Sequence, residues 1–206
     1  LRPYYVEGSK TLAFETCERL GWSTPYRVIV PVGSGALLCA IDRGFQELTR
    51  VGLVDHSEVK ITGAQAEGCL PVASAFKNGG NDILPVEKPD TIAKSLAIGD
   101  PGDGLYAARV MRRSGGLAES VTDWEIIDAI RLLAKKEGVF TEPAGAVTIA
   151  ALRKLLEKGD ISADERIVCY VTGSGLKAPD CLLSSLPQRV QIEPRLDALE
   201  AIRLEV

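Results

Sequence analysis

Two short glycine turns are the segments best suited to chemistry, and the first spans residues 33–37 (Gly-Ser-Gly-Ala-Leu). It directly follows an apolar run and opens a stretch with helical spacing. Glycines let backbone N–H groups approach a ligand closely, Ser34 adds a hydroxyl donor, and the N-terminus of a helix favours negative charge. The turn could therefore bind a phosphate group. The same pattern is equally typical of a tight strand-to-helix turn that binds nothing.

Common nucleotide-binding patterns do not fit this turn. A GxGxxG motif would need a third glycine where Leu38 stands, and no P-loop lysine follows the turn. A dinucleotide or a nucleoside triphosphate is therefore disfavoured as the ligand.

The second glycine turn spans residues 172–177 (Thr-Gly-Ser-Gly-Leu-Lys) and follows the apolar run 166–171. The hydroxyl of Thr172 could hydrogen-bond a ring nitrogen, and Lys177 could interact with an anion. From the residues alone, a polar turn with an exposed lysine is the simpler interpretation.

Composition excludes several classes of function. A net charge of −4 and a pI near 5.2 disfavour nucleic acid as a partner, since no basic stripe is available to neutralise phosphates. His56 is the only histidine and the five cysteines lack metal-ligand spacing, so we expect reduced thiols and no metal site. No apolar run approaches a membrane span and no signal peptide is visible, so we expect no membrane partner and a cytoplasmic location.

Short apolar runs alternate with longer segments of helical periodicity. We expect strands at 27–30, 60–64, 119–121 and 166–171, and helices at 9–20, 35–50, 70–76, 91–98, 104–113, 122–138 and 143–156. This alternation predicts an open α/β fold with three layers (αβα), in which helices cover both faces of a mainly parallel sheet. Residues 1–186 are expected to belong to one domain and residues 187–206 to form a strand and helix tail.

Local signals refine these elements. Thr122 and Glu125 have the spacing of a capping box at the start of a helix. Ser9 is expected to cap the first helix and to leave Lys10 exposed. Pro143 suits the first turn of the helix that it opens.

Six segments, taken in order, carry a resemblance to a known family. They read EGSKTLAFE (7–15), GAQAEG (63–68), KPDTIA (88–93), IGDP (98–101), EGVF (137–140) and VTGSGLK (171–177). Together they resemble the threonine synthases of the tryptophan-synthase-β-like, fold type II pyridoxal-phosphate enzymes. The similarity covers nearly the whole chain and implies pyridoxal 5′-phosphate as the cofactor.

The resemblance implies roles for particular residues. It places the cofactor phosphate on the backbone N–H groups of Gly33, Ser34, Gly35, Ala36 and Leu37. This turn reads GSGAL rather than the asparagine-rich GNAGN of other members, so contacts from its side chains are not expected.

Three further residues are assigned by the same resemblance. Thr172 stands where a hydroxyl bonds the pyridine nitrogen, and Ser95 stands where a small residue packs beside the cofactor ring. Arg2 lies near an arginine that grips the substrate phosphate, a role that suits a guanidinium fork.

The implied reaction converts O-phospho-L-homoserine and water to L-threonine and phosphate, the last step of threonine biosynthesis. The resemblance also implies a homodimer. The family's Schiff-base lysine lies in an earlier segment resembling SFKDR, which has no counterpart here; Lys10 and Lys177 belong to other motifs. The chain begins at Leu1 and its only methionine is Met111. We therefore expect a fragment that lacks its N-terminal half, contains no catalytic lysine and is inactive in isolation.

Two alternatives remain open. The first is another enzyme of the same fold: a threonine or serine dehydratase, which would not need Arg2, or a cysteate synthase, which uses a phosphorylated serine. The second is a non-catalytic module that binds a phosphorylated metabolite.

Overall fold

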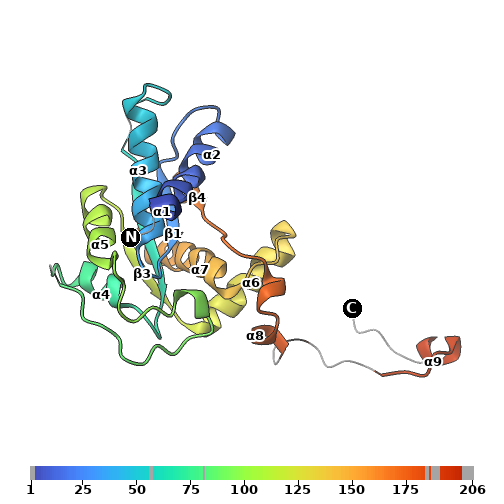
Figure 1. Ribbon diagram of the computed structural model, residues 1–206. Helices are drawn as coiled ribbons and strands as arrows, with labels where there is room; N and C mark the ends of the chain where they lie inside the picture. The colour runs from blue at the N-terminus through green and yellow to red at the C-terminus, as the bar shows by residue number, and fades with distance from the viewer. Residues whose placement is uncertain (1–2, 56–57, 81, 184–185, 187–190, 201–206) are drawn as a thin grey trace.

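The computed structural model describes residues 3–55, 58–80, 82–183, 186 and 191–200. Within them lies a four-stranded parallel sheet in the order β3-β2-β1-β4 (Figure 1). Its strands are β1 (Arg27–Pro31), β2 (Lys60–Ala66), β3 (Ala118–Val121) and β4 (Ile167–Cys169). Because every pair is parallel, all four carboxyl ends lie at one edge of the sheet, which we call the carboxyl edge.

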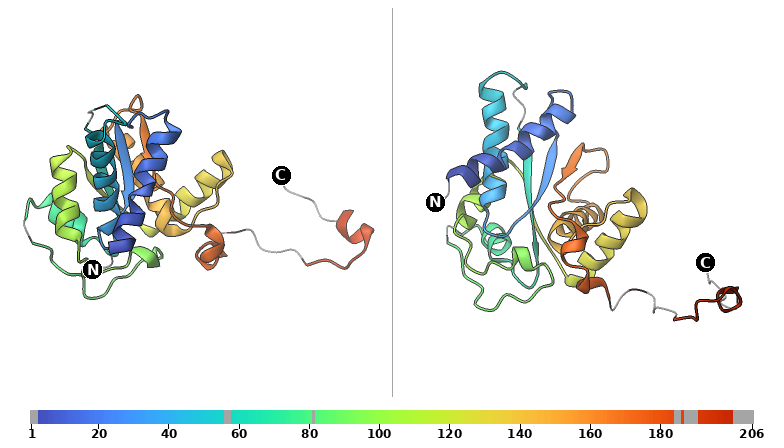
Figure 2. Two further views of the ribbon diagram at one scale, coloured as in Figure 1. Left: turned by 45° about the horizontal axis from the view of Figure 1, so that its top comes forward. Right: turned by 45° about the vertical axis from the view of Figure 1, so that its right-hand side comes forward.

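Helices cover both faces of the sheet, as the alternating pattern predicted (Figures 1 and 2). One apolar core lies between the sheet and a first set of helices, and a second core lies on the opposite face. The first set is α2 (Thr11–Arg19), α3 (Ala36–Arg50), α4 (Pro71–Lys77) and α5 (Gly104–Arg113), and the opposite face carries α6 (Asp123–Glu137) and α7 (Pro143–Lys158). The three-layer α/β fold is confirmed.

The central strand β1 shows why the sheet needs both layers. All five of its residues are buried. Val28 and Val30 contribute to the core under α2, α3 and α5, whereas Ile29 contributes to the core under α6 and α7. Side chains alternate between the faces of a strand, so a run of consecutive apolar residues is stable only where both faces are covered.

The predicted signals at α6 and α7 are confirmed. The Thr122 backbone N–H donates to the Glu125 carboxylate at 2.6 Å, and the Glu125 N–H donates back to the Thr122 hydroxyl at 3.2 Å. Helix α6 ends at Gly138, whose φ of 69° is left-handed, and Pro143 occupies the first turn of α7.

The helix expected over 91–98 is wrong: only a short 3-10 helix, η1 (Lys94–Leu96), forms there. The Thr91 hydroxyl donates to the Asp123 carboxylate at 2.6 Å, and the Ile92 N–H donates to the same carboxylate at 3.1 Å. These bonds to the start of α6 hold the segment in an irregular path across the carboxyl edge. Strand β4 is also shorter than expected and only half-buried, because β1 alone pairs with it among the described residues.

The helix expected at 9–20 is α2 (Thr11–Arg19), and a helix that was not predicted, α1 (Pro3–Ser9), precedes it. Ser9 ends α1 and its hydroxyl donates to the Tyr5 carbonyl, so it is not the predicted cap. Lys10 is 6% exposed, and its Nζ lies 2.6 Å from Glu47 and 2.7 Å from Glu7. The expectation of an exposed Lys10 is wrong, since two carboxylates hold its ammonium group against α3 and raise its pKa, Glu47 first and Glu7 second.

The chain ends in short elements. They are η2 (Gly175–Lys177), α8 (Asp180–Leu183) and α9 (Leu196–Glu200). No strand forms over the described residues 191–195, and the division of the chain at 186/187 stays a prediction. No helix within the described parts of the chain is long and apolar enough to cross a lipid bilayer.

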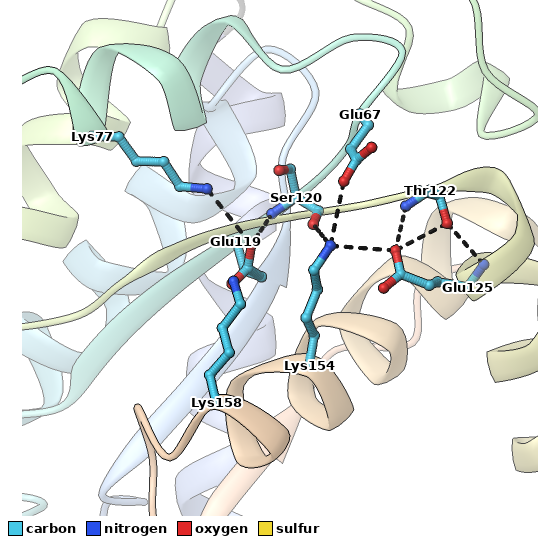
Figure 3. Close-up of polar contacts among 8 residues, drawn as sticks. All are labelled: Glu67, Lys77, Glu119, Ser120, Thr122, Glu125, Lys154 and Lys158. Atoms are coloured by element: carbon cyan, nitrogen blue, oxygen red, sulfur yellow. Dashed lines mark hydrogen bonds and ion pairs between the residues drawn. The ribbon is translucent and has the colours of Figure 1, made fainter.

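A polar network fixes α7 beneath the carboxyl edge (Figure 3). Lys154 of α7 donates to the Ser120 carbonyl at 2.9 Å and lies 3.3 Å from Glu67 and 3.4 Å from Glu125. One turn further along α7, Lys158 contacts Glu119, whose side chain is only 4% exposed. Because Lys154 joins Ser120 of β3 and Glu67, the residue after β2, to α6 and α7, it orients the helices that flank the candidate site.

The buried Glu119 stays ionised because several donors surround it. Burial alone would raise the pKa of Glu119. The hydrogen bond from Lys158, the backbone N–H of Ser120 at 2.9 Å and the ammonium group of Lys77 at 3.6 Å outweigh burial and hold the pKa below its usual range.

Candidate functional site

The two glycine turns lie beside each other at the carboxyl edge. Turn 33–37 follows β1 and turn 172–177 follows β4, which is hydrogen-bonded to β1. The Tyr170 N–H, two residues before the second turn, donates to the carbonyl of Ile29, four residues before the first turn, at 3.0 Å. Ligands of open α/β sheets bind at this kind of crevice, beyond the carboxyl ends of neighbouring strands.

The turn after β1 presents unpaired backbone donors, and we call residues 33–37 the anion cup. Within the described residues, the N–H groups of Gly33, Ser34 and Gly35 have no protein acceptor. Helix α3 begins directly after them at Ala36, and Gly35 has a left-handed φ of 93°. Several free N–H groups at the N-terminus of a long helix suit a phosphate group. The residues present therefore fit the phosphate of a cofactor.

The segment 95–103 forms a wall beside the anion cup. The carbonyl oxygen of Ser95 lies 3.3 Å from the position that a Cβ on Gly33 would take. On the other side, the Asp103 N–H donates to the Ser34 carbonyl at 3.0 Å. The structure thus brings Ser95 to the cup, and contact of its side chain with a cofactor ring stays a prediction.

The turn after β4 is held by the start of α7. The Gly173 carbonyl accepts hydrogen bonds from the Glu142 N–H at 3.0 Å and from the Thr141 hydroxyl at 2.9 Å. The Glu142 carboxylate occupies the place of a Gly173 side chain, because a Cβ there would lie 2.0 Å from Oε1. Thr172 is exposed at this edge, and contact of its hydroxyl with a ligand stays a prediction.

Neither of the two motif lysines is free at the site. Lys177 has its Nζ 4.0 Å from the Glu142 carboxylate, which places a negative charge beside it. Lys10 pairs with Glu47 in the last turn of α3, whereas the anion cup lies at the first turn of this 15-residue helix. With a rise of 1.5 Å per residue, roughly 15–20 Å separates these two ends. Arg2, predicted to grip the substrate phosphate, lies outside the described residues.

Two residues that contact these turns were missed by the sequence prediction. Neither Glu142 nor Gln65 was assigned to the site, and Gln65 appeared only within the segment GAQAEG (63–68). Gln65 is 1% exposed on β2 and bonds the Val32 carbonyl. The available signal was an amide side chain inside a strand whose other inner residues are small or apolar.

The model of the family described as pyridoxal-phosphate dependent enzymes matches residues 1–173. The chain belongs to this family. Its cofactor is therefore pyridoxal phosphate, which agrees with the prediction and with the unpaired donors of the anion cup.

Individual relatives agree with the resemblance read from the sequence. The chain is 46% identical to the threonine synthase of Methanocaldococcus jannaschii, over all of this chain and 51% of that protein. It is 42% identical to the threonine synthase of Methanosarcina acetivorans, over 98% of this chain and 50% of that protein. The chain thus spans about half the length of these curated relatives.

Solved structures agree on the fold. An L-serine ammonia-lyase from the fungus Rhizomucor miehei aligns with a TM-score of 0.68 at 23% identity, over 82% of this chain and 51% of that one. At this identity the likeness shows the fold alone. The prediction of a fold type II pyridoxal-phosphate enzyme is confirmed.

Proposed function

We propose that this chain is part of a threonine synthase, a lyase that converts O-phospho-L-homoserine and water to L-threonine and phosphate in threonine biosynthesis. The observation that carries the proposal is the 46% identity to a curated threonine synthase across all 206 residues. The unpaired donors at the carboxyl edge support it, because a phosphate-bearing cofactor needs such a site.

In this proposal, the anion cup holds the cofactor phosphate. The donors are the backbone N–H groups of Gly33, Ser34, Gly35, Ala36 and Leu37. Backbone donors at a helix N-terminus are fixed before the ligand arrives, so little ordering is needed on binding. Bound pyridoxal phosphate would supply an electron sink that stabilises negative charge on the substrate.

Thr172 and Ser95 orient the cofactor ring. Thr172 follows β4 and would place a neutral hydroxyl against the pyridine nitrogen, which favours the unprotonated nitrogen. Ser95, whose carbonyl lies beside Gly33, would pack its small side chain along the ring. The two residues lie in different connections of the sheet, Thr172 directly after β4 and Ser95 between β2 and β3.

Binding of the substrate phosphate and covalent attachment of the cofactor need residues outside those that the structure describes. Arg2 is proposed to bind the substrate phosphate through its guanidinium fork. The Schiff-base lysine is proposed to come from the half of the relatives' length that this chain does not span, and Lys10 and Lys177 are engaged elsewhere. A homodimer completes the proposed assembly.

The test measures phosphate release and threonine formation from O-phosphohomoserine with added pyridoxal phosphate. It uses the protein at its full natural length and, separately, the 206-residue chain. We expect both products from the former and neither from the latter. A protein that instead deaminates threonine would be a dehydratase of the same fold. Turnover of O-phosphoserine without threonine formation would point to a cysteate synthase.

A further inference from the structure

Gln65 connects the anion cup to two other elements through a single buried amide. Its Nε2 donates to the Val32 carbonyl at 3.1 Å, and its Oε1 accepts from the Ala73 N–H at 2.8 Å. The side chain is 1% exposed, so water cannot replace either bond. One residue of β2 therefore holds both Val32, the residue directly before the cup, and the first turn of α4.

The bond to Val32 controls the orientation of a peptide plane. The Val32 N–H already donates to the Ala64 carbonyl at 2.9 Å, and Gln65 fixes the carbonyl of the same residue. A trans peptide is planar, so the N–H of the next residue points opposite to this carbonyl. Holding the Val32 carbonyl toward β2 thus directs the Gly33 N–H away from β2. Gly33 carries the first unpaired donor of the anion cup.

The second bond anchors the amide itself. Ala73 lies in the first turn of α4, whose N–H groups have no partner within the helix, and Leu70 supplies no side-chain cap. The Gln65 oxygen satisfies one of these donors and so fixes which end of the amide faces Val32. A residue here must donate at one end and accept at the other, and Gln meets both needs at this length.

We propose that Gln65 is a positioning residue for the cofactor phosphate: it orients the Val32–Gly33 peptide so that the Gly33 N–H faces the anion. The proposal rests on the proposed function, because it takes the anion to be the phosphate of pyridoxal phosphate. Gln65 itself does not touch the ligand. Its loss should therefore weaken binding of the phosphate end and leave binding of the ring unchanged.

The test compares two ligands that differ only in this phosphate, pyridoxal phosphate and pyridoxal. Their dissociation constants are measured by equilibrium dialysis on the protein at its full natural length. The variant Gln65→Met keeps the shape of the side chain and removes both hydrogen bonds. The variant Gln65→Glu keeps the acceptor for Ala73 and removes the N–H donor to Val32, so it serves if Gln65→Met does not fold.

The matched control is Thr62→Val on the same strand. Thr62 is fully buried and accepts from Arg27 at 3.0 Å and from the Leu117 N–H at 3.3 Å, toward the opposite end of β2. This variant also removes a buried polar group with two partners, and it leaves the anion cup intact. Thermal unfolding midpoints of all variants show how much each destabilises the fold.

We expect Gln65→Met to weaken pyridoxal phosphate binding about tenfold, on the scale of one lost hydrogen bond to a charged group. Pyridoxal binding should stay within about twofold, and Thr62→Val should leave both ligands unaffected. The role of Gln65 would be overturned, with the cofactor site left standing, by either of two results. One is an equal loss of affinity for both ligands. The other is a lowered thermal unfolding midpoint with no loss of affinity for pyridoxal phosphate. A wild-type protein that binds neither ligand would overturn the proposed cofactor site, and this inference with it.

Discussion

The carbonyl oxygen of Asp103 lies 2.7 Å from the position that a Cβ on Gly35 would occupy. Gly35 also has a φ of 93°, and it is the residue directly before α3. Backbone conformation and contact thus both require glycine at this point of the anion cup. The wall formed by residues 95–103 can approach the cup only because this side chain is missing.

Replacement of Gly35 by alanine should therefore abolish measurable binding of pyridoxal phosphate and lower the free energy of unfolding by about 2–4 kcal/mol. Equilibrium dialysis and urea unfolding measure the two effects. Gly52→Ala is the matched control, since Gly52 has a φ of 72° but no heavy atom within 4 Å of an added Cβ. That control should cost about 1 kcal/mol and leave binding intact. Equal binding by the two variants would contradict the assigned cup.

A second prediction concerns the hydroxyl of Thr172. Thr172→Val keeps the shape of the side chain and removes the proposed bond to the ring nitrogen, so threonine formation by the full-length protein should fall about tenfold or more. Thr172→Ser, which keeps the hydroxyl, should retain most of the activity. Thr49→Val is a suitable control, because its hydroxyl donates to the Phe45 carbonyl near the far end of α3. Full activity in Thr172→Val would remove this residue from the site.

The ion pair between the buried Glu119 and the exposed Lys158 predicts how the stability of the fold depends on pH in the acid range. The pKa of Glu119 is lowered in the folded state, so the unfolded chain binds its proton at a higher pH than the folded chain does. The stabilisation is therefore present above the unfolded pKa of about 4.3 and is lost as the pH falls through the folded pKa. Urea unfolding between pH 7 and pH 3.5 measures this loss. Glu119→Gln should cost about 2 kcal/mol at pH 7 and make the acid dependence shallower. An unchanged acid dependence in this variant would show that other carboxylates dominate.

Lys10 provides a test of the catalytic assignment. Its ammonium group is enclosed by Glu7 and Glu47, so Lys10→Met should lower the thermal unfolding midpoint without weakening pyridoxal phosphate binding. Borohydride reduction followed by peptide mapping then identifies the lysine that carries the cofactor. Labelling of Lys10 would contradict its purely structural role.

The elements that were predicted correctly carry their determinants within a few residues. The capping box of Thr122 and Glu125 and the glycine turn after β1 are examples, since each depends on neighbours in the sequence. The sheet followed from consecutive buried residues such as those of β1. These signals were sufficient to bring the two glycine turns to one edge.

The predictions were wrong where a partner distant in the sequence determines the local structure or the burial of a residue. The segment 91–98 has helical periodicity, but the Asp123 carboxylate takes its first two donors. Lys10 is buried because Glu47, far along the chain, pairs with it. The role of Gln65 depends on its hydrogen bonds to Val32 and Ala73, which the fold brings next to it. The spacing of residues in the sequence does not indicate any of these long-range contacts.

The strand order has a consequence for how the site is assembled. Strand β1 pairs with β2 after a short crossover, but its other neighbour β4 lies about 140 residues further along the chain. Closing so long a loop is slow compared with forming local contacts. On the ribosome, the anion cup can therefore fold against β2 well before Thr172 has been synthesised. The cofactor would then meet a phosphate site first and a complete ring site only when β4 docks.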